Sequence, residues 1–120
     1  MQDYKSLMVW KKSHNIVLEI YKLTKSFPKE ELFGLAGQMR RAALSIPTNI
    51  AEGAGRGSKA DFNRFLQISF GSISELEYEL RLSKDLSFIS EPDYSRNMIL
   101  IIEVKKMLSG LIKSIKKSGS

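Results

Sequence analysis

Apolar residues recur at intervals of three and four along most of the chain, which is the spacing of one face of an α-helix. The pattern divides into four segments, at about residues 7–25, 30–55, 58–86 and 91–117. The alternation of apolar and polar residues that is typical of a half-buried strand is missing. Four long helices with short connections predict an all-α fold, a single-domain antiparallel up-down-up-down four-helix bundle.

The apolar positions also predict which side chains form the core. Steps of three and four align them in a seam of the kind that packs helices closely and nearly parallel. The expected core-facing residues are Val9, Ile16, Ile20 and Leu23 in the first segment, Leu32, Leu35, Met39, Ala42, Ile46, Asn49 and Gly53 in the second, Phe62, Leu66, Ser69, Ile73, Leu76 and Leu80 in the third, and Met98, Ile101, Val104, Leu108, Leu111 and Ile115 in the fourth.

Short signals mark the helix ends. Phe27 stands before Pro28 and is therefore disfavoured in the helical region, so the first helix should end there. Ser58 begins a Ser-x-x-Asp sequence and Ser90 begins Ser-Glu-Pro-Asp. Both serines are expected to cap the helix that follows, with the proline in the first turn of the fourth helix, where its missing N–H is not needed.

The stretch SIPTNIAEGAGRGS, residues 45–58, places a proline inside the second helix and glycines at its close. Pro47 removes one hydrogen bond and predicts a kink, but the seam keeps its register from Ile46 to Ile50, which favours one continuous helix. The glycines within 55–57 tolerate the positive φ of a helix C-terminus. A phosphate-binding loop is not expected, because such a loop follows a strand and ends in Gly-Lys-Ser or Gly-Lys-Thr.

Two polar residues of this stretch have structural interpretations. Asn49 is expected in the core, as a hydrogen-bonding residue that sets helix register rather than as a catalyst. Glu52 is expected to pair with Arg56 one turn later, or with an arginine of a neighbouring helix.

Candidate catalytic and metal-binding residues are few. The chain of 120 residues has no cysteine and one histidine, His14. A di-metal site in a helical bundle needs Glu-x-x-His on each of two helices, and Lys11 stands where the glutamate before His14 would be. We therefore expect a surface or partly packed role for His14, and a protein that is not an enzyme and uses no metal or cofactor.

The net charge of +6 becomes directional in an antiparallel bundle. One end gathers residues 1–14, 52–66 and 105–120, with a formal charge of +8, whereas residues 75–94 bring −4 to the opposite end. Such a field favours a polyanionic partner. Lysines also keep a helix surface hydrated and complement the dipole at a helix C-terminus, which is the simpler interpretation of the same residues.

Phosphate contact with RNA or DNA, at low sequence specificity, is the expected function of the basic end. Few aromatic residues accompany the cations, so stacking on bases is not expected. The predicted contact residues are Arg56, Lys59, Arg64, Lys113, Lys116 and Lys117, with Arg40 and Arg41 as further candidates.

The compartment is predicted from what the sequence lacks. The start MQDYKSLMVW does not have the layout of a signal peptide. The longest apolar run, residues 98–102, is far below the roughly 20 residues that span a bilayer. We expect a soluble cytoplasmic protein.

Many of these residues belong to a pattern that resembles the bacterial four helix bundle protein family, also called 23S rRNA-intervening-sequence proteins. The resemblance covers about residues 7–90, and its Ser-Ile-Pro-x-Asn-Ile-Ala-Glu-Gly core is specific. The pattern comprises Trp10, Phe27-Pro-Lys-Glu30, Gly34-Leu, Gln38-Met-Arg-Arg41-Ala-Ala, Ser45-Ile-Pro-Thr-Asn-Ile-Ala-Glu-Gly53, Phe65-Leu and Gly71-Ser-Ile-Ser-Glu-Leu-Glu77.

The family is similar to the accessory variability determinant of diversity-generating retroelements, a basic homopentameric barrel of four-helix protomers that binds nucleic acid and its reverse transcriptase. The resemblance thus implies a homopentamer, nucleic-acid binding and a partner protein. The motif residues that it marks, as structural or inter-protomer rather than catalytic, are Arg40, Arg41, Ser45, Pro47, Asn49 and Glu52.

Two alternative functions stay open. The fourth segment has a second apolar group beyond its seam, formed by Ile99, Leu100, Ile102 and Met107. A helix that is apolar on more than one side needs another partner, which suits a ring of equally oriented subunits or an oligomeric scaffold that binds proteins without nucleic acid.

The ending KKMLSGLIKSIKKSGS resembles a cationic amphipathic helix of a membrane surface, but the core needs its apolar face, so we expect no membrane partner.

Overall fold

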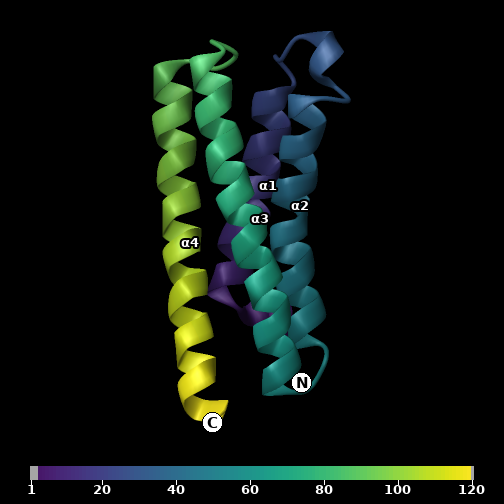
Figure 1. Ribbon diagram of the computed structural model, residues 1–120, viewed down its shortest axis with the longest axis vertical. Helices are drawn as coiled ribbons and strands as arrows, with labels where there is room; N and C mark the ends of the chain where they lie inside the picture. Colours follow the sequence, from purple (N-terminus) through teal and green to yellow (C-terminus); the bar gives the residue numbers. More distant parts are fainter. Residues whose placement is uncertain (1–2, 120) are drawn as a thin grey trace.

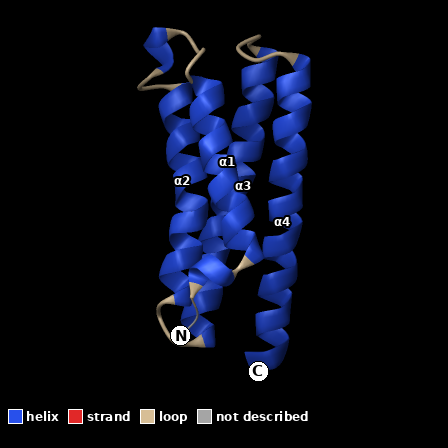
Figure 2. Cartoon of the chain, turned by 180° about the vertical axis from the view of Figure 1, so that it is seen from behind, coloured by secondary structure: helices blue, strands red, loops and turns tan. Residues whose placement is uncertain are grey.

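The computed structural model describes residues 3–119, and its long elements are four α-helices (Figure 1). They are α1 (Met8–Thr24), α2 (Leu35–Ala54), α3 (Lys59–Asp85) and α4 (Glu91–Gly119). Two short 3-10 helices, η1 (Tyr4–Ser6) and η2 (Lys29–Glu31), precede α1 and α2. Figure 2 shows helices and loops and no strand in this described part, which confirms the all-α prediction.

Successive helices run in opposite directions, so both chain ends and the α2–α3 turn lie at one end of the bundle (Figure 1). We call this the terminal end, and the other the far end. Each helix packs most closely against two others, with α1 and α3 both contacting α2 and α4. The result is an antiparallel four-helix bundle of 46 × 22 × 20 Å.

The interior is built from the predicted seams of all four helices. Burying one such aliphatic side chain contributes about 1.5–3 kcal/mol, so this interior is the main source of stability. The fully buried side chains are Ile16, Ile20, Met39, Ile46, Ile50, Leu66, Ile73, Leu76, Leu80, Ile101, Val104 and Leu108.

The start of α2 differs from the prediction. The helix begins at Leu35 rather than near residue 30, because η2 and a turn take up the intervening chain. The carboxylate of Glu31 accepts a hydrogen bond from the backbone N of Leu35 at 3.0 Å and so satisfies one of the free amides of the first turn. Leu32, expected in the core, lies outside the helical period and is 48% exposed.

The middle of α2 bears out one expectation and corrects another. The helix continues through Pro47, whose ring is buried. Asn49 is only partly buried, and its Nδ2 donates to the carbonyl O of Ser45 at 2.8 Å and to Ser45 Oγ at 2.9 Å. The prediction of Asn49 in the core is therefore wrong. The apolar seam steps directly from Ile46 to Ile50. Asn49 therefore lies at the edge of the buried face of α2, where its amide is partly exposed.

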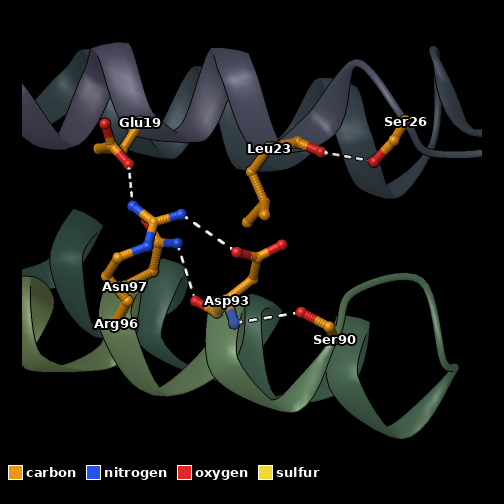
Figure 3. Close-up of polar contacts among 7 residues, drawn as sticks. All are labelled: Glu19, Leu23, Ser26, Ser90, Asp93, Arg96 and Asn97. Atoms are coloured by element: carbon orange, nitrogen blue, oxygen red, sulfur yellow. Dashed lines mark hydrogen bonds and ion pairs between the residues drawn. The ribbon is translucent and has the colours of Figure 1, made fainter.

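Polar contacts join α4 to α1 at the far end (Figure 3). The backbone N of Asp93 donates to Ser90 Oγ at 3.2 Å, which confirms the predicted cap. Arg96 binds Asp93 at 3.2 Å and reaches across to Glu19 of α1. Asn97 Nδ2 donates to the carbonyl O of Asp93 at 2.9 Å. Arg96 therefore connects α4 to α1 at this end.

Candidate functional site

A tight passage from α2 into α3 shapes the terminal end. Gly57 has a φ of +84°, and Ser58 Oγ accepts from the backbone N of Asp61 at 3.1 Å, as predicted for the cap. A Cβ at Gly53 would stand 2.8 Å from Phe65 Cβ, so the absent side chain lets α3 approach α2 closely. These residues form the end of one helix and the start of the next.

Two arginines are held over the ring of Phe65. Arg56 and Arg64 lie 5.0 and 4.5 Å from its centroid. Arg56 also pairs with Glu52 at 3.0 Å, as predicted, and Arg64 with Asp61 at 3.7 Å. Their side chains remain 46% and 59% exposed. Ring and carboxylate hold each guanidinium at the surface, where its planar fork can bind a phosphate through two hydrogen bonds.

Lysines from α3 and α4 extend this surface. Lys59 Nζ donates to the carbonyl O of Ser118 at 3.3 Å, which ties the start of α3 to the last turns of α4. Lys113 and Lys116 are exposed and make no polar contact with another described residue, so their ammonium groups can bind an outside anion. We call the six predicted residues at this end the basic cluster: Arg56, Lys59, Arg64, Lys113, Lys116 and Lys117.

The other two predicted contact residues lie elsewhere. Arg40 Nε donates to Thr24 Oγ1 at 2.8 Å, and its guanidinium lies 5.0 Å from the centroid of Tyr21. Arg40 precedes the end of α2 by 14 residues, or about 21 Å of helix. Arg41 is near Glu79 of α3. The structure does not bring Arg40 and Arg41 to the basic cluster.

The basic end is also narrower than the charge of +8 suggested. Lys12 pairs with Glu103 at 3.0 Å, and Lys105 pairs with Glu77 at 2.8 Å. Both lysines were counted with the basic end, but acidic residues on neighbouring helices compensate them near the middle of the bundle. Among the described lysines at this end, Lys5, Lys11, Lys106, Lys113 and Lys116 form no ion pair.

A buried carboxyl group on α3 was missed. Glu79 is 6% exposed, and its Oε1 receives no hydrogen bond from a donor among the described residues. Burial, together with the hydrogen bond to Glu75 and its charge, raises the pKa of Glu79 to about 8, while Arg41 acts in the opposite direction. With its pKa raised to about 8, Glu79 is mostly protonated at neutral pH. The available signal in the sequence was its position three residues after Leu76, which puts Glu79 on the same buried face of α3.

The described residues offer neither a metal site nor a membrane span. Within 3–119, no three His, Cys, Asp or Glu side chains form a group that could hold a metal ion. His14 is exposed and stacks on Trp10, with ring centroids 5.1 Å apart, in the surface role expected for it. None of the described helices combines the length and apolar character needed to cross a bilayer.

A solved structure of a protein of unknown function from the S23 ribosomal protein family, from Bacteroides thetaiotaomicron, superposes with a TM-score of 0.81 at 31% identity. The match covers 88% of this chain and 95% of that one. No curated protein matches the chain. The model of the 23S rRNA-intervening sequence protein family matches residues 5–110, and the chain belongs to that family.

Proposed function

We propose that the protein binds RNA or DNA through backbone phosphates at the terminal end, with little sequence preference and without catalysing a reaction. The observation that carries the proposal is that the residues of the basic cluster come from the α2–α3 turn, the first turns of α3 and the last turns of α4, which lie at one end of the bundle. Each cation that neutralises a phosphate releases condensed counterions, which favours binding. We place this activity in the cytoplasm.

We further propose assembly into a ring through α4. Ile99 is 69% exposed, and the groove beside it, of about 610 Å³, is lined by Tyr94, Met98 and Ile102. An exposed apolar strip of this kind fits a protein partner. Copies oriented alike would place their basic clusters on one face and add their fields. The number of five subunits rests on the family resemblance.

Salt dependence of binding tests the nucleic-acid proposal. Affinity for generic RNA and DNA should fall linearly on a log–log plot, with a slope of about −0.7 to −0.9 for each phosphate neutralised. Six contacts would give a slope of about −4 to −5. Absence of binding at low salt, or a flat response to salt, refutes the proposal.

A matched pair of triple variants locates the site. Replacing Lys113, Lys116 and Lys117 with glutamine should weaken binding and make the slope shallower by about 2–3. Replacing Lys22, Lys25 and Lys29, which are exposed toward the far end, removes the same charge and should change binding far less. Equal losses from both triple variants would mean that net charge acts without a defined site.

The alternative function is an oligomeric scaffold that binds a partner protein and no nucleic acid. The exposed strip on α4 around Ile99 is the observation that favours it. Pull-down with and without nuclease separates the two functions. Partners that stay bound after nuclease treatment support the scaffold, and partners that are lost support a bridge of nucleic acid.

A further inference from the structure

A groove beside the basic cluster runs between the start of the chain and α2. It has a volume of about 480 Å³. The residues that matter for its chemistry are Tyr4 of η1, Trp10 and His14 of α1, and Pro47, Thr48 and Glu52 of α2. Glu52 also pairs with Arg56 at 3.0 Å, so one side chain belongs to the groove and holds a member of the basic cluster.

Three aromatic rings form the side of the groove that η1 and α1 contribute. Trp10 and His14 are stacked, with centroids 5.1 Å apart and planes 5° from parallel. Tyr4 meets Trp10 edge-on at 4.9 Å and 66°. The imidazole of His14 is exposed, so this stack can be extended from solvent. The expectation that few aromatic residues accompany the cations did not anticipate that the fold would gather these rings near the basic end.

We propose that this groove holds an unpaired nucleobase of the bound nucleic acid. The inference rests on the proposed function and deepens it: phosphates bind the basic cluster while one base stacks against the rings. Aromatic side chains bind bases of any sequence in this way, because every base has a π-face. On the α2 side, the Glu52 carboxylate can accept a hydrogen bond from an exocyclic amino group. Cytosine should therefore bind better than thymine.

Charge favours a nucleobase over an organic cation, the other ligand that aromatic groups bind. Of the described residues that line the groove, Glu52 is the acidic one, and Arg56 already compensates it. Lys11, next to Trp10, is exposed and adds a positive charge close by. These cations repel a cationic ligand and attract the phosphates that flank a base.

The sole tryptophan of the chain, Trp10, makes the test specific to this groove. Tryptophan emission is followed while the wild-type protein is titrated with oligo(dC), oligo(dT) and a DNA duplex of equal length, and anisotropy of the labelled DNA reports binding in parallel. The single strands should quench the emission, with oligo(dC) bound more tightly than oligo(dT). The duplex should bind with little quenching, because its bases are already stacked.

Two ring-removing variants provide the matched comparison. His14→Ala should weaken single-strand binding about 5- to 150-fold, the range expected for loss of a stacking aromatic, and leave duplex binding unchanged. Tyr78→Ala removes a ring that is 64% exposed on α3, outside the groove, and should change neither. The comparison of single strand with duplex on the wild-type protein does not depend on the folding of any variant.

Each failure has its own meaning. Equal binding of single strand and duplex with unchanged emission refutes the base site and leaves phosphate binding intact. Failure of both DNAs to bind refutes the proposed function, and the base site with it. Emission that responds to protein concentration and not to DNA identifies the groove as an interface between copies, which also overturns the base site.

Discussion

Charged side chains lie at both ends of the bundle, but they have different partners. At the far end, Arg96 pairs with Glu19 and Asp93, Lys84 with Glu91, and Arg81 with Asp85. Lys22, Lys25 and Lys29 are exposed at this end and form no ion pair with another described residue. At the terminal end, Lys113 and Lys116 have no polar partner among the described residues. Both ends therefore hold unpaired lysines, but the far end also holds the acidic residues of 75–94, whereas α4 contains no acidic residue after Glu103.

The contrast shows that the local balance of charge, rather than the charge count of the chain, marks a candidate interface. Lys12 and Lys105 raise the formal charge of the chain, yet each is matched by an acidic residue of a neighbouring helix. Exposed pairs contribute little stability, roughly 0–1 kcal/mol each, but they remove the field that a distant ligand would sense.

The largest expected effect comes from Glu79, the acid that is buried rather than paired. The pKa of Glu79 is raised to about 8 in the folded protein. Its stabilising contribution is therefore complete below the pKa that Glu79 has in the unfolded chain, and it is lost as the pH rises through about 8. The free energy of unfolding should fall by about 2–4 kcal/mol between pH 5 and 8 and then level off. Urea denaturation across this range measures the fall.

The control for Glu79 is its neutral isostere. Glu79→Gln should flatten this part of the pH profile, whereas the exposed Glu91→Gln should leave it unchanged. A profile that keeps its slope in Glu79→Gln would assign the titration to another group.

The next effect concerns the close approach of α2 and α3 at the terminal end. Gly53→Val places a branched side chain where Cβ alone would meet Phe65 Cβ at 2.8 Å, and should destabilise by about 1–3 kcal/mol. Gly71→Ala, at an exposed position of α3 with nothing within 4 Å, should instead stabilise by about 1 kcal/mol. Denaturant midpoints measure both changes. A gain of stability in Gly53→Val as well would mean that α2 and α3 can move apart at little cost.

The two serine caps compare the ends directly. Ser58→Ala and Ser90→Ala each lose the acceptor of a first-turn amide, and each should cost about 1 kcal/mol of stability. Only Ser58→Ala should also weaken nucleic-acid binding, because its cap orders the turn between Arg56 and Lys59. Thermal unfolding and salt-titrated binding measure the two effects, and equal binding losses would contradict the assignment of the interface to one end.

The smallest stability effects come from surface arginines. Arg64→Gln and Arg96→Gln should each change the free energy of unfolding by less than about 1 kcal/mol, since both side chains are more than half exposed. Arg64→Gln should reduce the magnitude of the salt slope by about 0.7–0.9, and Arg96→Gln should leave it unchanged. The reverse order would move the nucleic-acid interface to the far end.

Much of the fold was predictable because its determinants are local. The four seams, the caps at Ser58 and Ser90 and the continuity of α2 through Pro47 follow from spacing and turn chemistry. The errors occur where another feature of the fold overrode the helical period. The predicted helical period included Leu32, but η2 and the turn after it exclude this residue from α2. It also included Asn49, but the seam steps from Ile46 to Ile50 and leaves Asn49 at the edge of the buried face.

The candidate site was predictable only in part. The six residues of the basic cluster could be assigned to one end because chain direction follows from helix order. The separate placement of Arg40 and the exposed aromatic groove could not be predicted. Helical spacing tells which residues share a face, but not which face of another element lies opposite.

Helix positions, caps and the lengthwise division of charge were therefore contained in the sequence by itself, since the helical period and capping hydrogen bonds involve residues only a few positions apart. Tertiary structure alone decided which charges are paired between helices, that Tyr4, Trp10 and Glu52 line one groove, and that Glu79 is buried. Lys105 and Glu77 are 28 residues apart in the chain, and only the packing of whole helices brings such side chains within 2.8 Å.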